Sequence, residues 1–595
     1  MKHLFPFLKQ YRKESILAPL FKMLEATFDL LVPIVVSDII KTGIGNGDAA
    51  YIWTRCGLLV LMALIGLLCS FTAQYFAARA AIGTSTGLRH QLMAHIQSLS
   101  FSELDTLGIS TLITRMTSDV NQVQNGLNMF LRLFLRSPFI VAGAMIAAFT
   151  IDAQVALIFV AAIPVLSVIV FGIMRVTSPM YKRVQGNLDA VTGATRENLS
   201  GVRVVRAFGR EDAEEQQFVA QNSRLTDMQL KVGRIAALMN PLTYVVVNIG
   251  IIAILYFGAG KVESGTLLSG DIVALVNYMN QILVELVKLA NLVVLLTRAI
   301  ASMGRISQVL DTESSMHFPE KDASDAKGNA DAEKNADAEK SADEEKNTDE
   351  VRFDHVSLQY RGAGDESLTD VTFTAKRGQT IGVIGGTGSG KTTLVSLISR
   401  FYDATSGTVM LFGRPIADYP QAELRRRVAV VMQKAQLFQG TIRSNLLWGN
   451  ENATDDELWH ALEIAQAAEF VRAKPGKLDE TVEQGGRNLS GGQRQRLTIA
   501  RALVGHPDIV ILDDSASALD YATDAALRKA LRTLPEGTTL FIVSQRTSSL
   551  RHADQIIVLD DGHVAGIGTH DELMQGCDVY REIHESQFRK GSDML

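Results

Sequence analysis

Six long apolar runs occupy the first half of the chain, and they restrict its fold more than any other feature. They span about residues 16–41, 57–83, 128–151, 153–174, 235–259 and 271–299. Most reach the ~20 residues with which a helix crosses a ~30 Å hydrocarbon core. The first run is the least regular, because it contains Lys22, Glu25 and Asp29. A large helical core domain accounts poorly for six such runs. We therefore expect six long transmembrane helices.

The charges of the connecting loops predict the orientation of these helices. The short connections at 42–52, 150–153 and 260–270 contain only one base, Lys261. The long connections at 84–127 and 175–234 are rich in arginine and lysine. By the positive-inside rule, the long loops and both termini face the cytosol of a multi-pass protein in the cell (inner or plasma) membrane. The long loops also carry a continuous helical pattern, so the helices should extend beyond the bilayer. The first fifteen residues indicate a retained N-terminus and not a cleaved signal peptide.

An acidic repeat separates the two halves of the chain. Residues 319–350 contain twelve acidic side chains and five lysines, whereas the whole chain has a net charge of −6. The acidity therefore belongs to this segment and says nothing about a nucleic-acid or acidic partner for the folded parts. We expect a transmembrane domain over 1–311, an acidic disordered linker over 312–350, and a nucleotide-binding domain over 351–590. The three cysteines, Cys56, Cys69 and Cys577, show no metal-ligand spacing or disulfide framework.

Short apolar strands alternate with helical segments after residue 350. The expected strands are Val351–Tyr360, Thr380–Gly385, Val428–Met432, Ile509–Leu512, Leu540–Val543 and Gln555–Leu559. This alternation predicts an α/β domain with a largely parallel sheet. The fold class is therefore a membrane α-helical domain followed by a cytosolic α/β P-loop ATPase domain.

A glycine-rich octet between a strand and a helix predicts a phosphate-binding loop. Its residues are Gly385, Gly386, Thr387, Gly388, Ser389, Gly390, Lys391 and Thr392, and Thr393 follows them in the helix. Glycines let successive N–H groups and the helix N-terminus point at phosphate. Lys391 should reach the terminal phosphates of ATP, and the Thr392 hydroxyl should bind Mg2+. A plain glycine-rich turn is the weaker interpretation in this setting.

Two further motifs complete the nucleotide chemistry. The strand that ends at Asp513 delivers a carboxylate beside the loop to hold Mg2+. The sequence Leu489, Ser490, Gly491, Gly492 and Gln493 lies between the loop and this strand. With these motifs in this order, the chain resembles the ATP-binding cassette (ABC) family. Because six spans precede the cassette, it resembles an exporter-type half-transporter over nearly its whole length.

The resemblance assigns roles to further residues. It implies that Tyr360 stacks on adenine and that Gln433 senses Mg2+ and the membrane loops. It also implies that Asp520 lies in the segment that crosses to a partner cassette. Residues 113–120 and 197–203 resemble the cytosolic loops that press on the cassettes, with docking turns near 101–110 and 205–215.

Two positions depart from the family pattern. Asp514 stands where the family has a glutamate as general base, and Gln545 stands where it has a switch histidine. Aspartate is one methylene shorter, which displaces its oxygens by about an ångström from the attacking water. Glutamine donates a hydrogen bond but carries no positive charge for the transition state. The pair therefore predicts poor hydrolysis in this chain's own pocket.

The intact motif at residues 489–493 points to a heterodimer. In the family, two cassettes meet head to tail, and each ATP lies between one phosphate loop and the other subunit's signature motif. A homodimer would hold two impaired sites, so we expect a partner half-transporter that carries the catalytic glutamate and the switch histidine. The signature of this chain would then complete the partner's active site.

The sequence specifies the transported substrate least. Polar residues within the last span, Asn277, Asn280, Gln281, Glu285 and Lys288, favour a watery pathway, although Glu285 and Lys288 could equally form a local ion pair. We expect an ATP-driven exporter, in a lipid bilayer, of a hydrophobic or amphipathic small molecule, lipid or peptide. An importer with the exporter fold and an ATP-regulated channel or sensor subunit are the alternatives. No nucleic-acid partner is expected.

Overall fold

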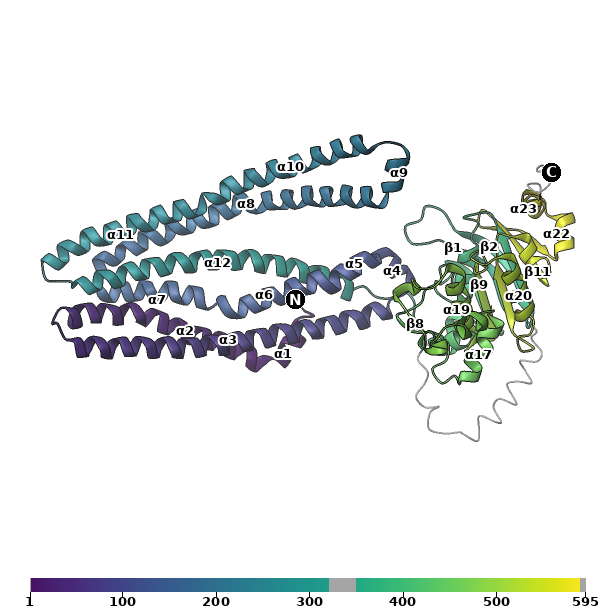
Figure 1. The fold of residues 1–595 in the computed structure, drawn as a ribbon, viewed down its shortest axis with the longest axis horizontal. Helices are drawn as coiled ribbons and strands as arrows, with labels where there is room; N and C mark the ends of the chain where they lie inside the picture. The colour runs from purple at the N-terminus through teal and green to yellow at the C-terminus, as the bar shows by residue number, and fades with distance from the viewer. Residues whose placement is uncertain (1, 320–348, 589–595) are drawn as a thin grey trace, which may run out of the picture. The chain divides into compact units, whose positions relative to one another are not determined.

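The computed structural model describes residues 2–319 and 349–588 (Figure 1). The chain forms two compact units: Met1–Gln97 with Ile109–Thr312, and Ser98–Gly108 with Glu313–Leu595. Residues 320–348, which contain the repeat of the predicted acidic linker, lie outside the described residues.

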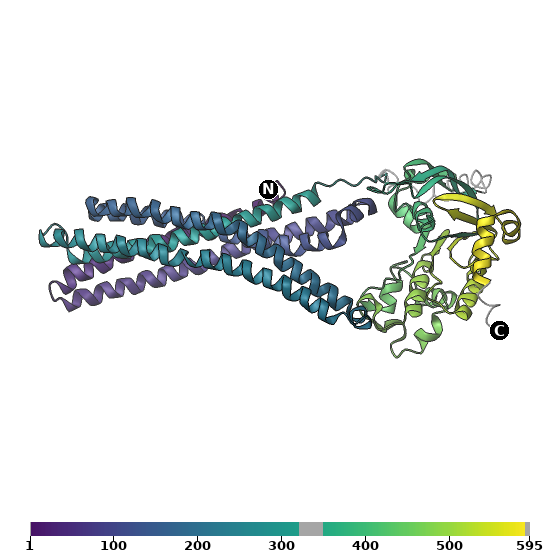
Figure 2. The same ribbon diagram turned by 90° about the horizontal axis from the view of Figure 1, so that it is seen from above.

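The first unit is a bundle of long helices (Figures 1 and 2). Its helices, together with the short α4 of the second unit, are α1 (Phe5–Gln10), α2 (Arg12–Asp38), α3 (Ala49–Ser98), α4 (Phe101–Leu107), α5 (Ile109–Thr114), α6 (Val120–Leu133), α7 (Arg136–Ile151), α8 (Ala153–Ser200), α9 (Val202–Ala207), α10 (Glu211–Ala237), α11 (Met239–Glu263) and α12 (Ser269–Leu310). Two π-helical segments, η1 (Ile39–Ile44) and η2 (Arg115–Asp119), continue α2 and join α5 to α6. The first and last predicted spans correspond to α2 and α12.

Four helical stretches of the described chain are long and apolar enough to cross a membrane. They are Ala49–Ser98, Ile109–Ile151, Ala153–Ser200 and Glu211–Glu263, and they contain the second to fifth predicted spans. Helices α2 and α12 are not among them, and both carry ionisable side chains within their apolar runs. Helices α3 and α8 continue without a break far into the long basic loops, as the sequence pattern predicts.

The tight connection between α7 and α8 is fixed by a single aspartate. Asp152 has an extended backbone and caps α8, since its carboxylate accepts hydrogen bonds of 2.9 Å from the N–H groups of Gln154 and Val155. The same carboxylate pairs with Lys261 of α11 at 2.5 Å. One side chain therefore starts α8 and ties it to the end of α11.

The second unit contains a parallel sheet and a separate antiparallel sheet. The strands are β1 (Asp349–Leu358), β2 (Leu368–Lys376), β3 (Thr380–Gly385), β4 (Ser406–Leu411), β5 (Arg414–Pro415), β6 (Val428–Val431), β7 (Gly440–Thr441), β8 (Thr481–Val482), β9 (Ile509–Asp513), β10 (Thr539–Val543), β11 (Gln555–Asp560) and β12 (His563–Gly568). The six-stranded sheet has the order β12-β11-β3-β10-β9-β6, and only β12 runs antiparallel. The four-stranded antiparallel sheet has the order β2-β1-β4-β5.

The helices of this unit pack around these sheets. They are α14 (Lys391–Ile398), α15 (Gln421–Arg427), α16 (Ile442–Leu446), α17 (Asp455–Ile464), α18 (Ala468–Arg472), α19 (Gly491–Leu503), α20 (Tyr521–Leu531), α21 (Thr547–Leu550), α22 (His570–Gly576) and α23 (Asp578–Phe588). Side chains of β9 alternate between two cores. Ile509 and Ile511 join the core shared with the antiparallel sheet, whereas Val510 and Leu512 join the core shared with α17 and α19. A strand buried on both faces explains the continuous apolar run in the sequence.

The antiparallel sheet is the main difference from the sequence prediction. The first expected strand, Val351–Tyr360, is β1, but it pairs antiparallel with β2 and β4 and does not join the parallel sheet. Stacking of Phe353 on Phe373, with ring centroids 4.6 Å apart, anchors β1 to β2. The pairing of these strands depends on tertiary contacts that the local sequence pattern does not specify.

Glu350 is a buried carboxyl at the start of β1. It is 2% exposed, the Thr539 hydroxyl donates to its Oε2, and its Oε1 has no partner among the described groups. Burial, and secondarily the charge of Asp508, raises the pKa of Glu350 to about 8. The folded protein therefore keeps this carboxyl protonated at pH values where the unfolded chain has lost the proton.

Glu350→Gln is expected to remove a pH-dependent loss of stability. Because the pKa of Glu350 is raised on folding, its contribution is fully present below pH 4.5, falls as the pH rises to about 8, and is constant above that. A tenfold change in proton affinity corresponds to ~1.4 kcal/mol, so the rise of the pKa from 4.5 to about 8 limits the loss to ~5 kcal/mol. Thermal unfolding at pH 5 and pH 9 should show the variant stabilised only at pH 9. Glu451→Gln, which changes an exposed carboxyl, is the control; equal gains at both pH values would contradict the expectation.

Candidate functional site

The glycine octet forms a loop between the end of β3 and the start of α14. Gly388 and Gly390 have φ values of +86° and +93°, which disfavour other residues. A Cβ at Gly390 would also lie 2.6 Å from the carbonyl oxygen of Ser367. The loop backbone therefore requires glycine at this position, and it brings N–H groups to the N-terminus of α14.

Lys391 folds over this loop. Its Nζ donates to the carbonyl oxygens of Gly385 at 3.0 Å and Gly386 at 2.5 Å. Burial lowers the pKa of Lys391, while the charges of Asp514 and Asp513 oppose that shift. The ammonium group is held by weak carbonyl acceptors that a phosphate can replace. The glycine backbone and this cation together fit the phosphates of ATP.

Thr392 and Asp513 provide oxygen ligands beside the loop. The Thr392 hydroxyl donates to Asp513 Oδ1 at 3.2 Å, which links the first turn of α14 to the end of β9. Asp513 is 5% exposed, and burial, more than any other influence, raises its pKa. A hydroxyl and a carboxylate are the ligand types that Mg2+ takes at nucleotide sites, so the residues present fit this ion.

Asp514 directly follows this strand and turns sharply away from it. Its φ of +44° places it in the left-handed region, which aspartate tolerates better than most residues. Its Oδ2 accepts a hydrogen bond of 3.3 Å from Gln433 Nε2. Burial raises the pKa of Asp514, against the effects of Gln433, Lys391 and Arg546. Two of the predicted catalytic residues, Gln433 and Asp514, therefore lie in direct contact.

Gln545 follows β10 and lies at the same carboxyl ends of the parallel strands as Asp513 and the phosphate loop. This strand lies between β3 and β9, so its carboxyl end emerges between the phosphate loop and Asp513. The Gln545 side chain is exposed, and the backbone carbonyl oxygen of this residue accepts a hydrogen bond of 2.7 Å from Gln587 Nε2. The neighbouring Arg546 lies with its guanidinium 4.8 Å from the ring centroid of Tyr521. Its positive charge opposes the rise in the pKa of Asp514 that burial causes. The sequence pattern assigns no role to Arg546.

Tyr360 lies beside the loop and meets residues that the sequence pattern does not single out. Its hydroxyl donates to Thr393 Oγ1 at 3.1 Å, and its ring packs edge-on against Tyr402 with centroids 5.0 Å apart. The Tyr402 hydroxyl donates to Asp105 of α4 at 2.5 Å. Phe101 of the same helix packs on Phe401, with centroids 4.7 Å apart. Helix α4, one of the predicted docking turns, thus belongs to the compact unit that holds the phosphate loop. The family resemblance, which places a docking turn near residues 101–110, is the sequence signal for this contact.

The motif at residues 489–493 forms the N-terminus of α19. Ser490 caps the helix by accepting from the N–H of Gln493, and Gln493 Oε1 accepts from the N–H of Ser490 at 3.0 Å. Leu489 is buried, whereas Ser490 and Gly491 are exposed. Asp520 similarly caps α20. These groups are ordered by their own helices and remain open to a second molecule.

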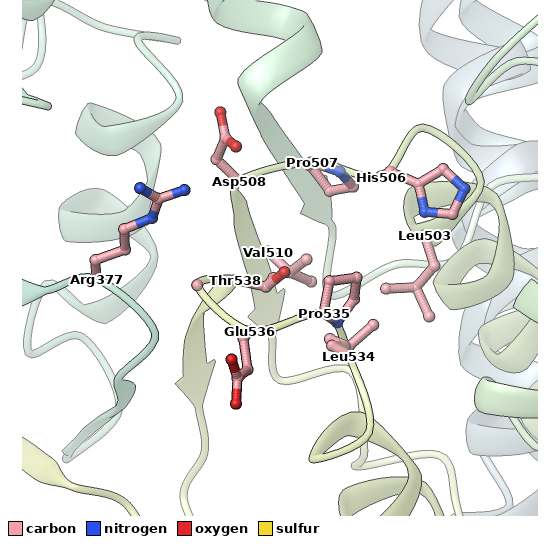
Figure 3. A pocket seen from close by; sticks show the side chains of 11 residues that line it. Arg377, Leu503, His506, Pro507, Asp508, Val510, Leu534, Pro535, Glu536 and Thr538 are labelled. Carbon is pink, nitrogen blue, oxygen red and sulfur yellow. The ribbon is translucent and has the colours of Figure 1, made fainter. Parts of the chain in front are cut away.

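A separate small cavity lies at the amino ends of the parallel strands, opposite the phosphate loop. It has a volume of about 170 Å3, and its lining includes Arg377, His506 and Asp508, which precede β3 and β9 (Figure 3). The phosphate loop and Asp513 follow the opposite ends of the same strands. The cavity contains none of the predicted site residues, so it is not the nucleotide site.

Comparison with known proteins agrees with these motifs. A family model described as the ABC transporter transmembrane region matches residues 15–286, and an ABC transporter model matches residues 368–517. An uncharacterized ABC transporter ATP-binding protein of Bacillus subtilis, YfiB, is 35% identical over 100% of both chains. An ATP-dependent lipid A-core flippase of Yersinia pestis bv. Antiqua is 27% identical over 99% of this chain and 97% of that one.

A solved structure shares the fold. It is described as a bacterial Atm1-family ABC exporter with ATP bound, and it has a TM-score of 0.77, an identity of 22%, and coverage of 98% of this chain and 99% of that one. The architecture is therefore an exporter-type helical domain with a C-terminal ABC ATPase domain. The chain belongs to the ABC transporter family, as a multi-pass membrane protein that binds ATP and couples its hydrolysis to transport.

Proposed function

We propose that this chain is the catalytically impaired subunit of a heterodimeric ABC exporter. The proposal rests on one observation above all: Asp514, directly after β9, has a side chain too short for the general-base role, although the phosphate loop and the cap of α19 are complete. Its Oδ2 lies 3.3 Å from Gln433 Nε2, so the short carboxylate is held by a neighbouring amide. Gln545 adds no positive charge at this edge.

The ATP of this chain's own site is held by the loop backbone, Lys391 and the ring of Tyr360. Thr392 and Asp513 would hold Mg2+, which when bound would neutralise phosphate charge there. Gln433 donates to Asp514 at 3.3 Å, so its position responds to changes in the carboxylate at this end of the pocket. These residues bind and orient the nucleotide, but Asp514 is poorly placed to polarise water.

The partner is a second half-transporter with the catalytic glutamate and the switch histidine. The exposed, capped Ser490 and Gly491 of this chain fit the role of completing that partner's ATP site. Asp520, at the N-terminus of α20, is the contact toward the partner cassette. This division of roles explains why one motif is complete while the other departs at two positions.

Export of an amphipathic molecule is the direction and substrate class that we favour. The flippase among the relatives acts on a lipid, and the helices of this chain form an exporter-type domain. The basic long loops place both termini and the ATPase domain in the cytosol, and the acidic residues 312–350 act as a spacer between the two domains. An importer with the same fold, or a regulated channel or sensor subunit, is the competing function.

Inverted membrane vesicles provide the test. With the partner co-expressed, we expect ATP-dependent uptake of a fluorescent amphiphile, and purified chain alone should hydrolyse ATP at least ~10²-fold more slowly than the pair. Vesicles that lack the partner are the control. Retained ATPase activity without uptake would favour the competing functions, and brisk turnover by this chain alone would exclude the heterodimer.

A further inference from the structure

Three helices of the membrane unit share a network of buried charges. Arg136, at the start of α7, donates to Glu285 Oε1 of α12 at 2.6 Å and to Asp29 Oδ2 of α2 at 2.9 Å. Lys288 donates to the same Oε1 of Glu285 at 2.9 Å, and Ser137 donates to Oε2 at 2.7 Å. Nearby, Lys22 and Glu25 of α2 form a further pair at 2.5 Å, so the bases and acids of the network balance.

The network has a closed end and an open end. Glu285 and Arg136 have side chains only 4% and 10% exposed, and Glu285 accepts three hydrogen bonds. Asp29 and Lys288, by contrast, have side chains 43% and 42% exposed, and each has one charged partner in the network. The local ion pair between Glu285 and Lys288 that the sequence allowed is therefore present, at 2.9 Å. Glu285 is enclosed by its partners, whereas the half-exposed Lys288 and Asp29 keep unused hydrogen-bonding capacity.

The open face of α12 carries several polar side chains, together with the exposed Val273 and Val284. Asn277, Asn280, Lys288 and Asn291 recur at three- to four-residue intervals or their multiples and are wholly or partly exposed. Ionisable groups within membrane helices face a bundle interior or a watery pathway, because lipid cannot solvate them. This face therefore adjoins an aqueous pathway, in which amide groups and two opposite charges are available to a ligand.

We propose that Asp29, Lys288 and the asparagine face of α12 bind the zwitterionic head group of an amphiphile. The ammonium group of the ligand contacts Asp29, and its phosphate contacts Lys288 and the asparagine amides. A ligand with both charges leaves the neutral network neutral, whereas a singly charged ligand adds an uncompensated charge beside the buried Arg136–Glu285 pair. The inference rests on the proposed export function and specifies its substrate class.

Binding of short-chain fluorescent lipids to the full chain with its partner in nanodiscs tests this assignment. The probes carry a phosphocholine, a phosphoglycerol or a cationic ethylphosphocholine head group. We expect phosphocholine to bind most tightly, and Asp29→Asn and Lys288→Met each to weaken it about tenfold or more. The two variants should also shift preference in opposite directions, Asp29→Asn toward the anionic probe and Lys288→Met toward the cationic probe.

Control variants distinguish head-group binding at this face from binding elsewhere on the bundle. Arg298→Met removes an exposed cation further along α12 and should leave all three affinities unchanged. Equal effects of the two network variants on all probes, or no effect, would overturn the proposal. Failure of a water-soluble thiol reagent to label Asn280→Cys in the complex would also overturn it, because the partner would then cover the face. Equilibrium binding needs no transport, so failure of ATP-dependent uptake alone would count against export and not against the site.

Discussion

Ser490→Ala in this chain is expected to abolish ATP hydrolysis by the heterodimer, whereas Asp514→Ala should leave most of it intact. Ser490 lies exposed at the N-terminus of α19 and, in the proposed dimer, faces the ATP held by the partner's phosphate loop. Asp514 belongs to the other site, where hydrolysis is already slow. Loss of one preorganised donor at a phosphate costs about 10²-fold or more in rate. Steady-state ATPase activity of the purified pair measures both effects.

Substitution of a second helix cap, Thr454, is the control that distinguishes loss of the contact between Ser490 and the partner's ATP from loss of stability of α19. Thr454 caps α17 through the same reciprocal bonding that Ser490 uses in α19. Removing either cap costs ~1 kcal/mol of stability, so Thr454→Ala should match Ser490→Ala in unfolding but retain ATPase activity. Equal damage from Ser490→Ala and Asp514→Ala would contradict the division of roles between the two sites.

Asp514→Glu combined with Gln545→His is expected to turn this chain into an active ATPase without its partner. The longer carboxylate reaches the attacking water, and the histidine supplies charge at the phosphate. Because the chain's own signature is complete, two copies would form two complete composite sites. We expect ATPase activity of the chain alone to rise by about 10²-fold, with each single substitution giving less.

The gain must depend on nucleotide held in the repaired site. Adding Lys391→Ala to the double variant removes the cation that folds over the phosphate loop, and it should return activity to the starting level. Unchanged activity in the double variant would mean that features other than Asp514 and Gln545 limit hydrolysis, which would refute the assigned cause of the impairment.

Local patterns predicted the elements that hold the nucleotide. The run Thr380–Gly385, the glycine octet and the following helix form β3, the loop and α14, because strand, turn and helix signals here coincide within a few residues. The strand that ends at Asp513 is likewise explicit in the sequence, since burial on both faces leaves a continuous apolar run. The pairing of Thr392 with Asp513 follows once both elements are placed.

Contacts between segments that are distant in the chain could not be predicted from the sequence. Arg136 stands at the start of α7, and nothing near it in the chain indicates that its partners are Asp29 and Glu285. Likewise, β2 alternates apolar and polar residues from Val371 to Ala375, but this pattern does not show that its partner is β1 or that the pair is antiparallel. Tertiary pairing decides these features, and local propensity carries little information about it.

The ATPase unit is discontinuous in the chain, and this has a consequence for fragments. A truncated protein that begins at β1 lacks α4, so the ring of Phe401 loses its cover and the hydroxyl of Tyr402 loses its acceptor, Asp105. Tyr402 packs against Tyr360, at the adenine end of the proposed pocket. Nucleotide affinities measured on such an excised domain would therefore describe a pocket whose adenine side differs from that of the intact polypeptide.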